Sequence, residues 1–447
     1  MPTKLQGFYI YKFGSKRLSK SKYRINIDIA EARKNSELVK LGDSAFLEVV
    51  RKVTNHPYNK DVLKKLESDK RLAQKKKDNS IHLLDILSKI DKQLLIEDIV
   101  EIQFENKTHY QKIFEKGLFI NGKEYVRVLA GAANLRRQTI FFIEKSIYKA
   151  VTDILDCGRN KNQLFNIPKF SAYFGLYNSA SHKVSFPSFV VIPDAEYTRM
   201  VKMDWVNEDN TIEEIEKDVT FNLFDGQGLI SPKQSKKWAM ELDIDWTPST
   251  WILRAPFLKG QFVTFDFHQF GEYVAGTNIV KDVWGNDVDI RYVDLVVSQS
   301  QFKLWDSYPN QRTYEKSCLE NGLGFRVTRY SQPYSNMKTY SNLNYMFVQV
   351  LNLDDGEIKQ LCQPTIDYFK DLMGADRKKM LTYLYPDSNN VNFHSIEPTV
   401  QALMLDEEFA KEPHIQKRFV NSLRKKIKES YLGNLLVESN FQPMISD

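Results

Sequence analysis

The sequence predicts an α+β protein in which a helical N-terminal region and a helical C-terminal region flank a central region of strands. Apolar residues alternate with polar ones at 7–13 and 22–29, which is the pattern of short strands. Helical spacing dominates 45–94 and again 355–435, whereas strand-like runs bounded by Gly, Pro and Asn recur between these two stretches. The predicted regions are 1–120 (short strands, then helices), 121–305 (central) and 306–447 (mostly helical).

The N-terminal helices have recognisable starts. Ser44 precedes the apolar run of the first helix, and Asn59 precedes the second. A third helix is expected over 81–94, with its leucines and isoleucines on one face. Farther on, Asn121-Gly122 separates two apolar runs, which predicts a β-hairpin.

The stretch 221–267 carries most of the functional information. Asp225 lies among turn-forming residues with Gly226 and Gly228. Ser231-Pro232 is typical of a helix start, because a serine caps the backbone and a proline lacks an N–H that the first turn does not need. Beyond this helix, a strand at 251–253 leads to Arg254, and a second strand opens at Lys259-Gly260.

Arg254 and Lys259 flank a short Ala-Pro-Phe-Leu connection. Arginine offers a planar fork for phosphate oxygens and lysine a mobile point charge, so the pair suits a polyanion. A glycine at 260 would let backbone or ligand approach closely. The same spacing also fits a surface loop with two solvated cations, and the spacing alone leaves both interpretations open.

The order of these motifs resembles a known family. A D-G-x-G turn, an I-S helix start, an arginine and then K-G recur in the cellular-type RNA-dependent RNA polymerases, which include the gene-silencing polymerases of eukaryotes and relatives in phages and bacteria. The residues that match are Asp225, Gly226, Gly228, Ile230, Ser231, Arg254, Lys259 and Gly260. The resemblance implies that 121–305 forms the first of the two double-psi β-barrels of these enzymes.

The resemblance also implies roles for individual residues. Arg254 and Lys259 would act at the catalytic site as a clamp on nucleotide or primer phosphates. Lys303 stands in an S-Q-S-Q-F-K element similar to the one that closes the first barrel, and Arg136 and Arg137 follow a small-residue stretch. These three would line the nucleic-acid channel, whereas Asp225, Gly226, Gly228 and Gly260 would shape turns. Each cation, taken singly, also fits a plain surface position.

The metal-binding motif of the family is missing from this sequence. Such polymerases hold two Mg²⁺ ions with a D-x-D-G-D motif of the second barrel. The Asp-rich stretches at 243–245, 287–289 and 354–356 do not fit this motif, and residues 434–447 resemble only the entry to the second barrel. We therefore expect no metal ligand in this chain, and Mg²⁺ only through a second barrel, for example on a separate polypeptide.

Composition narrows the class of protein. The chain is 42% hydrophobic and 27% charged, which is ordinary for a globular protein, and its net charge of +6 permits a nucleic-acid partner without requiring one. Three cysteines (Cys157, Cys318 and Cys362) lie far apart in sequence, so we expect buried thiols rather than a zinc site or a disulfide framework. With no apolar run typical of a signal peptide or a membrane span, a cytoplasmic protein is expected.

Three functions are compatible with the sequence. The first is one part of a single-subunit, RNA-directed RNA polymerase, a nucleotidyltransferase of a phage or mobile element. It would bind RNA or DNA template and ribonucleoside triphosphates, and be active only with a second part that carries the aspartates. The alternative is a nucleic-acid-binding protein without catalysis, in which the high aromatic content of 13% serves base stacking. The third is a structural or assembly protein of a phage whose aromatic residues all lie in the core.

Overall fold

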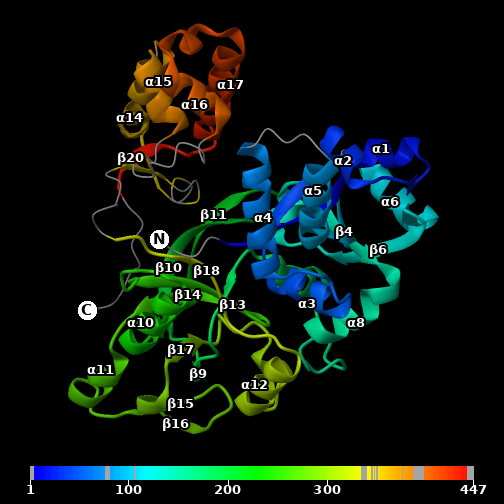
Figure 1. The fold of residues 1–447 in the computed structure, drawn as a ribbon. Coiled ribbons are helices and arrows are strands. Elements are labelled where there is room, and N and C mark those ends of the chain that lie inside the picture. The colour runs from blue at the N-terminus through cyan, green and yellow to red at the C-terminus, as the bar shows by residue number, and fades with distance from the viewer. Residues whose placement is uncertain are drawn as a thin grey trace. The chain divides into compact units, whose positions relative to one another are not determined.

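A computed structural model of the chain describes residues 5–75, 81–104, 107–333, 340–343, 346, 348, 351–374, 376–385 and 397–439. The chain divides into two compact units, Met1–Ser331 and Gln332–Asp447. Helices and strands are both abundant in the larger unit, which confirms the predicted α+β class (Figure 1). Of the stretch 434–447, which we compared with the entry to a second barrel, residues 440–447 lie outside the described residues.

A seven-stranded sheet forms the centre of the N-terminal region, in the order β2-β5-β6-β7-β4-β1-β3. Its strands are β1 (Gly7–Gly14), β2 (Arg24–Ile25), β3 (Leu38–Gly42), β4 (Leu95–Gln103), β5 (Leu118–Ile120), β6 (Lys123–Leu129) and β7 (Thr139–Glu144). The predicted hairpin at Asn121-Gly122 joins β5 to β6. Both turn residues have positive φ, of 49° and 79°, as a two-residue hairpin requires.

Helices surround this sheet: α1 (Ser15–Lys20), α2 (Ile29–Lys34), α3 (Ala45–Val53), α4 (Lys60–Lys75), α5 (Ile81–Leu94), α6 (Lys107–Lys116), α7 (Ala132–Arg136) and α8 (Lys145–Leu155). The predicted caps are confirmed, because the Ser44 hydroxyl accepts from Leu47 N at 3.2 Å and the Asn59 side chain accepts from Val62 N at 3.1 Å. Each cap satisfies a backbone donor that the first helical turn leaves unpaired.

The expected N-terminal boundary falls inside the sheet. Residue 120 ends β5, and its antiparallel neighbour β6 begins three residues later. The sheet of the N-terminal region extends to Glu144. The strands were underestimated because β4 and β7 lie in the middle of the sheet, so both their faces are covered and the alternation of polar and apolar residues is weak.

The central region holds a second seven-stranded sheet, in the order β8-β18-β13-β14-β12-β17-β9. Its strands are β8 (His182–Lys183), β9 (Phe189–Ile192), β12 (Gln227–Ile230), β13 (Thr250–Ala255), β14 (Leu258–Thr264), β17 (Leu295–Ser298) and β18 (Arg326–Tyr330). Most neighbours are antiparallel, but β12 pairs with β14 and β9 with β17 in parallel. The sheet includes β18, so it continues past the expected boundary at residue 305.

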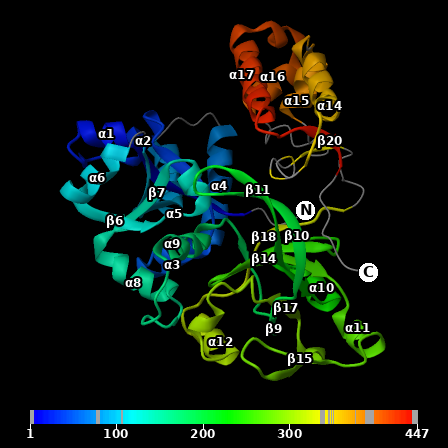
Figure 2. The ribbon, with the colours of Figure 1, turned by 180° about the vertical axis from the view of Figure 1, so that it is seen from behind.

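Short helices and two further hairpins complete this unit (Figure 2). They are α9 (Ile167–Phe174), η1 (Gly175–Asn178), β10 (Glu196–Val206), β11 (Ile212–Asn222), α10 (Pro232–Glu241), α11 (Phe267–Tyr273), β15 (Ile279–Lys281), β16 (Asp287–Asp289), η2 (Ile290–Tyr292), η3 (Trp305–Ser307) and α12 (Gln311–Glu320). The predicted helix start is confirmed, because Ser231 caps α10 and Pro232 is its first residue.

One apolar core joins the two large sheets. It includes Phe46 of α3, Phe141 of β7, and Trp238 and Trp251 from the central region, all fully buried. The two indole rings meet edge to face with centroids 6.0 Å apart. The two large sheets therefore share one apolar core, to which helix α3 also contributes.

The described part of the second unit is mainly helical. Its elements are β19 (Tyr340–Asn342), α14 (Asp355–Met373), α15 (Arg377–Leu384), α16 (Pro398–Leu405), η6 (Glu407–Lys411), α17 (Pro413–Ser430) and β20 (Leu436–Glu438). Helix α14 begins at an Asp354–Glu357 capping box and contains Pro364 in its interior. In the described ranges of the chain, no helix is long and apolar enough to cross a bilayer.

Candidate functional site

The predicted pair Arg254 and Lys259 lies at the end of a tight hairpin. Strands β13 and β14 are joined by Pro256-Phe257, and the register pairs Arg254 directly with Lys259. Residues directly opposite each other in an antiparallel pair project from the same face of the sheet. The register therefore gives the two cations a common face, and the tight turn fixes their spacing.

The glycines of the motif make room for a buried glutamine. Gln301 is fully buried, and its amide donates to the carbonyls of Gln261 (2.9 Å) and Gly226 (3.2 Å) and accepts from Ser298 N (3.0 Å). A Cβ at Gly260 would overlap the Gln301 amide, and one at Gly228 would lie 2.5 Å from its oxygen. Only glycine at these two positions leaves space for the amide that ties the turn to β14.

The same segment brings Lys303 to the hairpin. Lys303 N donates to Phe257 O at 2.9 Å, and Lys259 N donates to Gln301 O at 3.1 Å, so residues 301–303 run beside the turn. We call Lys169, Lys259 and Lys303 the lysine cluster. Burial lowers the pKa of Lys303, as do Lys259 and Lys169, while Asp225 and Asp194 raise it. The cluster is therefore an electropositive patch with one partly desolvated ammonium group.

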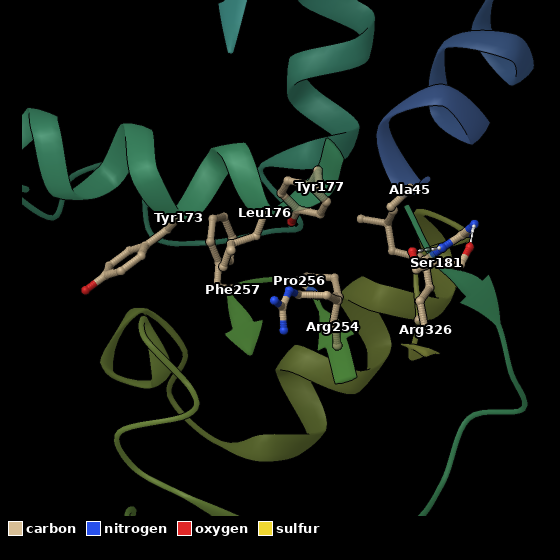
Figure 3. A pocket seen from close by; sticks show the side chains of 12 residues that line it. Ala45, Tyr173, Leu176, Tyr177, Ser181, Arg254, Pro256, Phe257 and Arg326 are labelled. Carbon is tan, nitrogen blue, oxygen red and sulfur yellow. Dashed lines mark hydrogen bonds between the residues drawn. The ribbon is translucent and has the colours of Figure 1, made fainter. Parts of the chain in front are cut away.

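Arg254 reaches into an adjoining pocket (Figure 3). The pocket is small and partly open to solvent, and its walls come from α9 and η1 (Tyr173, Tyr177), the hairpin turn and β18 (Arg326). The Arg254 guanidinium donates to Leu253 O at 2.7 Å, but its Nε has no hydrogen-bond partner in the described residues. Burial lowers the pKa of Arg254, and among those residues no carboxylate pairs with it.

Arg326, the second guanidinium of the pocket, is fully paired. It is buried, donates to Ser181 Oγ (3.0 Å) and Ser181 O (2.9 Å), and forms ion pairs with Glu48 and Asp43. It is also the β18 neighbour of Arg254 in the sheet. The charge of Arg326 is therefore compensated by carboxylates of the fold, whereas the charge of Arg254 has no paired carboxylate among the described residues.

Arg136 and Arg137 lie apart from the hairpin. Both are exposed at the end of α7, and no hydrogen bond or ion pair of the described residues links their side chains to the lysine cluster. The start of α7 does approach the pocket wall, since a Cβ at Gly175 of η1 would overlap Gly131. Asp225 is exposed in the turn before β12, where Gly226 has a φ of 72°.

Residues 60–442 match the profile of a protein family described as RNA dependent RNA polymerase. The chain belongs to this family. It is 27% identical over 379 residues to the DNA-directed RNA polymerase YonO of Bacillus phage SPbeta. The aligned residues make up 81% of this chain and 42% of YonO. Among solved structures, the RNA dependent RNA polymerase QDE-1 from Thielavia terrestris superposes with a TM-score of 0.42 and 13% identity, over 76% of this chain and 38% of QDE-1. The chain thus spans less than half the length of these relatives.

The metal ions expected for this polymerase family find no ligand set here. Among the described residues, no three His, Cys, Asp or Glu side chains come close enough together to hold a metal ion. Asp194 illustrates why, since its two oxygens accept from Asn222 Nδ2 (2.7 Å) and Ser300 N (2.9 Å) and so shape loops. The described residues therefore do not fit the Mg²⁺ pair.

Sequence reasoning missed several members of the site. Lys169, Asp194 and Gln301 were not singled out, because they come from segments with no cationic pattern of their own. Gln301 had a usable signal, since it is a polar residue three positions after the end of the buried strand β17 and directly before a buried Phe302. Such a position requires a buried partner, and the paired glycines Gly228 and Gly260 indicate where the space for it lies.

Proposed function

We propose that the chain is the first-barrel part of a cellular-type, single-subunit RNA polymerase. It would add ribonucleotides to RNA as a template directs, together with a second barrel that carries the metal-binding aspartates. Family membership supports this proposal, and so does the central sheet, whose mixture of parallel and antiparallel neighbours is compatible with the double-psi β-barrel expected from the sequence. Template, nucleotides and a separate polypeptide with the second barrel are its proposed partners.

The observation that carries the proposal is a group of cations that form no close ion pair among the described residues, although Asp225 and Asp194 lie near enough to raise the pKa of Lys303. Lys169, Lys259, Lys303 and Arg254 form no ion pair in the described part of the chain, although Lys303 and Arg254 are partly buried. Taking a charged group out of water is costly unless an opposite charge compensates it. A phosphate group that binds between these side chains would supply that charge.

The residues would then have distinct roles. Lys259 and Lys303 would contact the triphosphate or the nucleic-acid backbone as mobile point charges, and Arg254 would contribute a fixed fork. Placed before the reaction begins, such cations stabilise charge that develops on phosphate oxygens in the transition state. Arg136 and Arg137, on α7, are proposed to contact the template farther along the channel.

Binding of single-stranded RNA to the full chain tests the phosphate role. Fluorescence anisotropy at several salt concentrations would compare the wild type with Lys259→Ala and Lys303→Ala. Lys149→Ala is the matched control, because Lys149 is exposed and already paired with Asp153. We expect each site variant to bind more weakly and its log–log salt slope to fall by about 0.7 for the phosphate contact that it loses. Unchanged affinity and slope in both variants would contradict the role.

Catalysis requires a separate measurement. The chain would be mixed with a polypeptide that carries the D-x-D-G-D barrel, and incorporation of labelled ribonucleotides would be followed on an RNA and on a DNA template. We expect incorporation only in the mixture. Strand binding without incorporation on either template would favour the alternative, a nucleic-acid-binding protein without catalysis.

A further inference from the structure

Strands β10 and β11 form a two-stranded sheet of their own that leaves the central region as a long curved ribbon (Figures 1 and 2). We call this hairpin the arm. Its eleven paired positions run from Glu196–Asn222 at the base to Val206–Ile212 near the tip. At about 3.4 Å per residue the arm is about 35 Å long. Isolated two-stranded hairpins are marginally stable in water, so an arm of this length requires a compensating function or contact.

One face of the arm combines aromatic and cationic side chains. Strand alternation and the register place Tyr197, Arg199, Trp205, Lys217 and Phe221 on the same side. The Arg199 guanidinium lies 5.4 Å from the centre of the Phe221 ring, and Lys217 Nζ lies 4.7 Å from that of Trp205. Tyr197, Trp205 and Phe221 keep exposed fractions of 53%, 42% and 39%. Rings and positive charges thus lie next to one another on a solvent-facing surface.

The opposite face is acidic. It carries five carboxylates and a single lysine, which are Glu196, Asp204, Glu214, Glu216, Asp218 and Lys202. The aromatic face, in contrast, carries Arg199 and Lys217 against one carboxylate, Glu213. A polyanion is repelled from the acidic face and attracted to the aromatic one, so the distribution of charge selects both the side and the kind of ligand.

The base of the arm is continuous with the lysine cluster. Asn222 Nδ2 donates to Asp194 at 2.7 Å, and Leu223 N donates to Ala195 O at 2.9 Å, which closes the hairpin at its root. Asp194 also binds Ser300 N, three residues before Lys303, and raises the pKa of Lys303. A nucleic-acid strand whose phosphates contact the lysine cluster would therefore reach the arm next.

We propose that the aromatic face of the arm binds single-stranded nucleic acid that extends from the lysine cluster. Bases would stack on Tyr197, Trp205 and Phe221, while Arg199 and Lys217 contact the backbone phosphates. Stacking of this kind accepts every base, as a polymerase requires of a surface that guides any template or product. This inference rests on the proposed function, because the lysine cluster must hold the same strand.

The length of the RNA separates binding at the lysine cluster from binding at the arm. Anisotropy would be measured with labelled oligouridylates of about four and about sixteen nucleotides, which span the range of single-strand site sizes. We expect the double variant Trp205→Ala/Phe221→Ala to bind the long strand about thirtyfold or more weakly and the short strand normally, because it removes two rings on which bases would stack. Thr198→Ala/Thr220→Ala is the matched control on the acidic face, where the two hydroxyls share a hydrogen bond of 2.8 Å.

A second variant distinguishes the loss of specific contacts from unfolding of the arm. Arg199→Gln/Lys217→Gln keeps the rings, and its salt slope for the long strand should fall by about 1.4, which corresponds to two lost phosphate contacts. If both arm variants bind the long strand like the wild type while Lys259→Ala is impaired, the inference is wrong and the proposed function stands. If Lys259→Ala also binds normally, both are wrong. Normal strand binding combined with lost self-association in light scattering would assign the face to a protein contact instead.

Discussion

The buried amide of Gln301 occupies the space directly over Gly260, where any side chain would have its first carbon. The amide links the turn at Gly226, the strand β14 and the end of β17 through three hydrogen bonds. Two of the glycines in the polymerase-like motif therefore serve packing, and Arg254 and Lys259, which we propose bind phosphate, lie on strands that this packing holds together.

Gly260→Ala tests the packing. Forcing one extra carbon into a filled core costs about 1–3 kcal/mol, so the free energy of unfolding in urea should fall by that amount. Combining it with Gln301→Ala frees the space, and the double variant should lose less than the sum of the two single variants. Gly374→Ala, at a position with nothing within 4 Å, is the control. Additive losses would show that the two residues do not compete for space.

The pH dependence of RNA binding should report on Lys303. Because burial lowers its pKa, this ammonium group loses its charge at a lower pH than an exposed lysine. Affinity for single-stranded RNA should therefore be complete below that pKa and fall as pH rises through it. In Lys303→Arg, whose guanidinium stays charged, the alkaline fall should move to higher pH or disappear. Identical pH profiles for the two proteins would exclude Lys303 from phosphate binding.

Arg254→Met should stabilise the free protein and weaken its binding of nucleotide or RNA. The half-buried guanidinium has no counter-ion in the described residues and an unsatisfied Nε, so its replacement should stabilise the free protein by about 1 kcal/mol or more. The same change should weaken nucleotide or RNA binding by about 1.5–3 kcal/mol, the range for a hydrogen bond to a charged group. Thermal unfolding with and without a non-hydrolysable nucleotide measures both effects. A variant that is less stable and binds normally would contradict this assignment.

Arg326→Leu should destabilise the larger unit strongly. The change leaves Glu48 and Asp43 without their shared partner, although Lys183 and Arg51 still pair with them. Removing one member of a buried ion pair costs about 3–5 kcal/mol, and the remaining partners should keep the loss near about 3 kcal/mol. Lys149→Ala, which removes an exposed pair with Asp153, should cost less than about 0.5 kcal/mol. Similar losses in chemical denaturation would rule out a special role for the buried network.

Thiol labelling should distinguish the three cysteines. Cys157 and Cys318 are buried with sulfurs 3.6 Å apart, whereas Cys362 is only half-buried, contrary to the expectation of three buried thiols. Burial also raises the pKa of Cys318, which disfavours the reactive thiolate. A thiol reagent should modify one group quickly in the native protein and three in denaturant, and Cys362→Ser should abolish the fast reaction. Rapid labelling of two or three groups in the native protein would contradict this accessibility.

Local signals predicted much of the fold. The caps at Ser44, Asn59 and Ser231 and the Asn121-Gly122 turn are confirmed because each depends on neighbours within four residues. In α14, however, Pro364 lies inside the helix, nine residues after its first residue Asp355, where a proline usually ends or kinks a helix. The capping box at Asp354 and packing of the helix outweigh the backbone hydrogen bond that Pro364 lacks.

Non-local contacts account for what the sequence did not reveal. Arg254 and Lys259 were found because a five-residue interval became a tight hairpin, so their pairing is a local property. Lys169 and Gln301 reach the site from α9 and from the segment after β17, and no sequence period connects these segments to the hairpin. The arm was also not predicted from the sequence, and its strands pair residues up to 26 positions apart, Glu196 with Asn222.

The turn that joins β13 to β14 is fastened by a segment more than forty residues farther along the chain, through the bond from Lys303 N to Phe257 O. The lysine cluster therefore depends on contacts between segments that are distant in the sequence. A partly synthesised or cleaved chain that ends before residue 301 would carry Lys259 but lack the complete cluster. If the lysine cluster binds polyanions as we propose, affinity for a polyanion measures the fraction of chains in which the larger unit is fully folded.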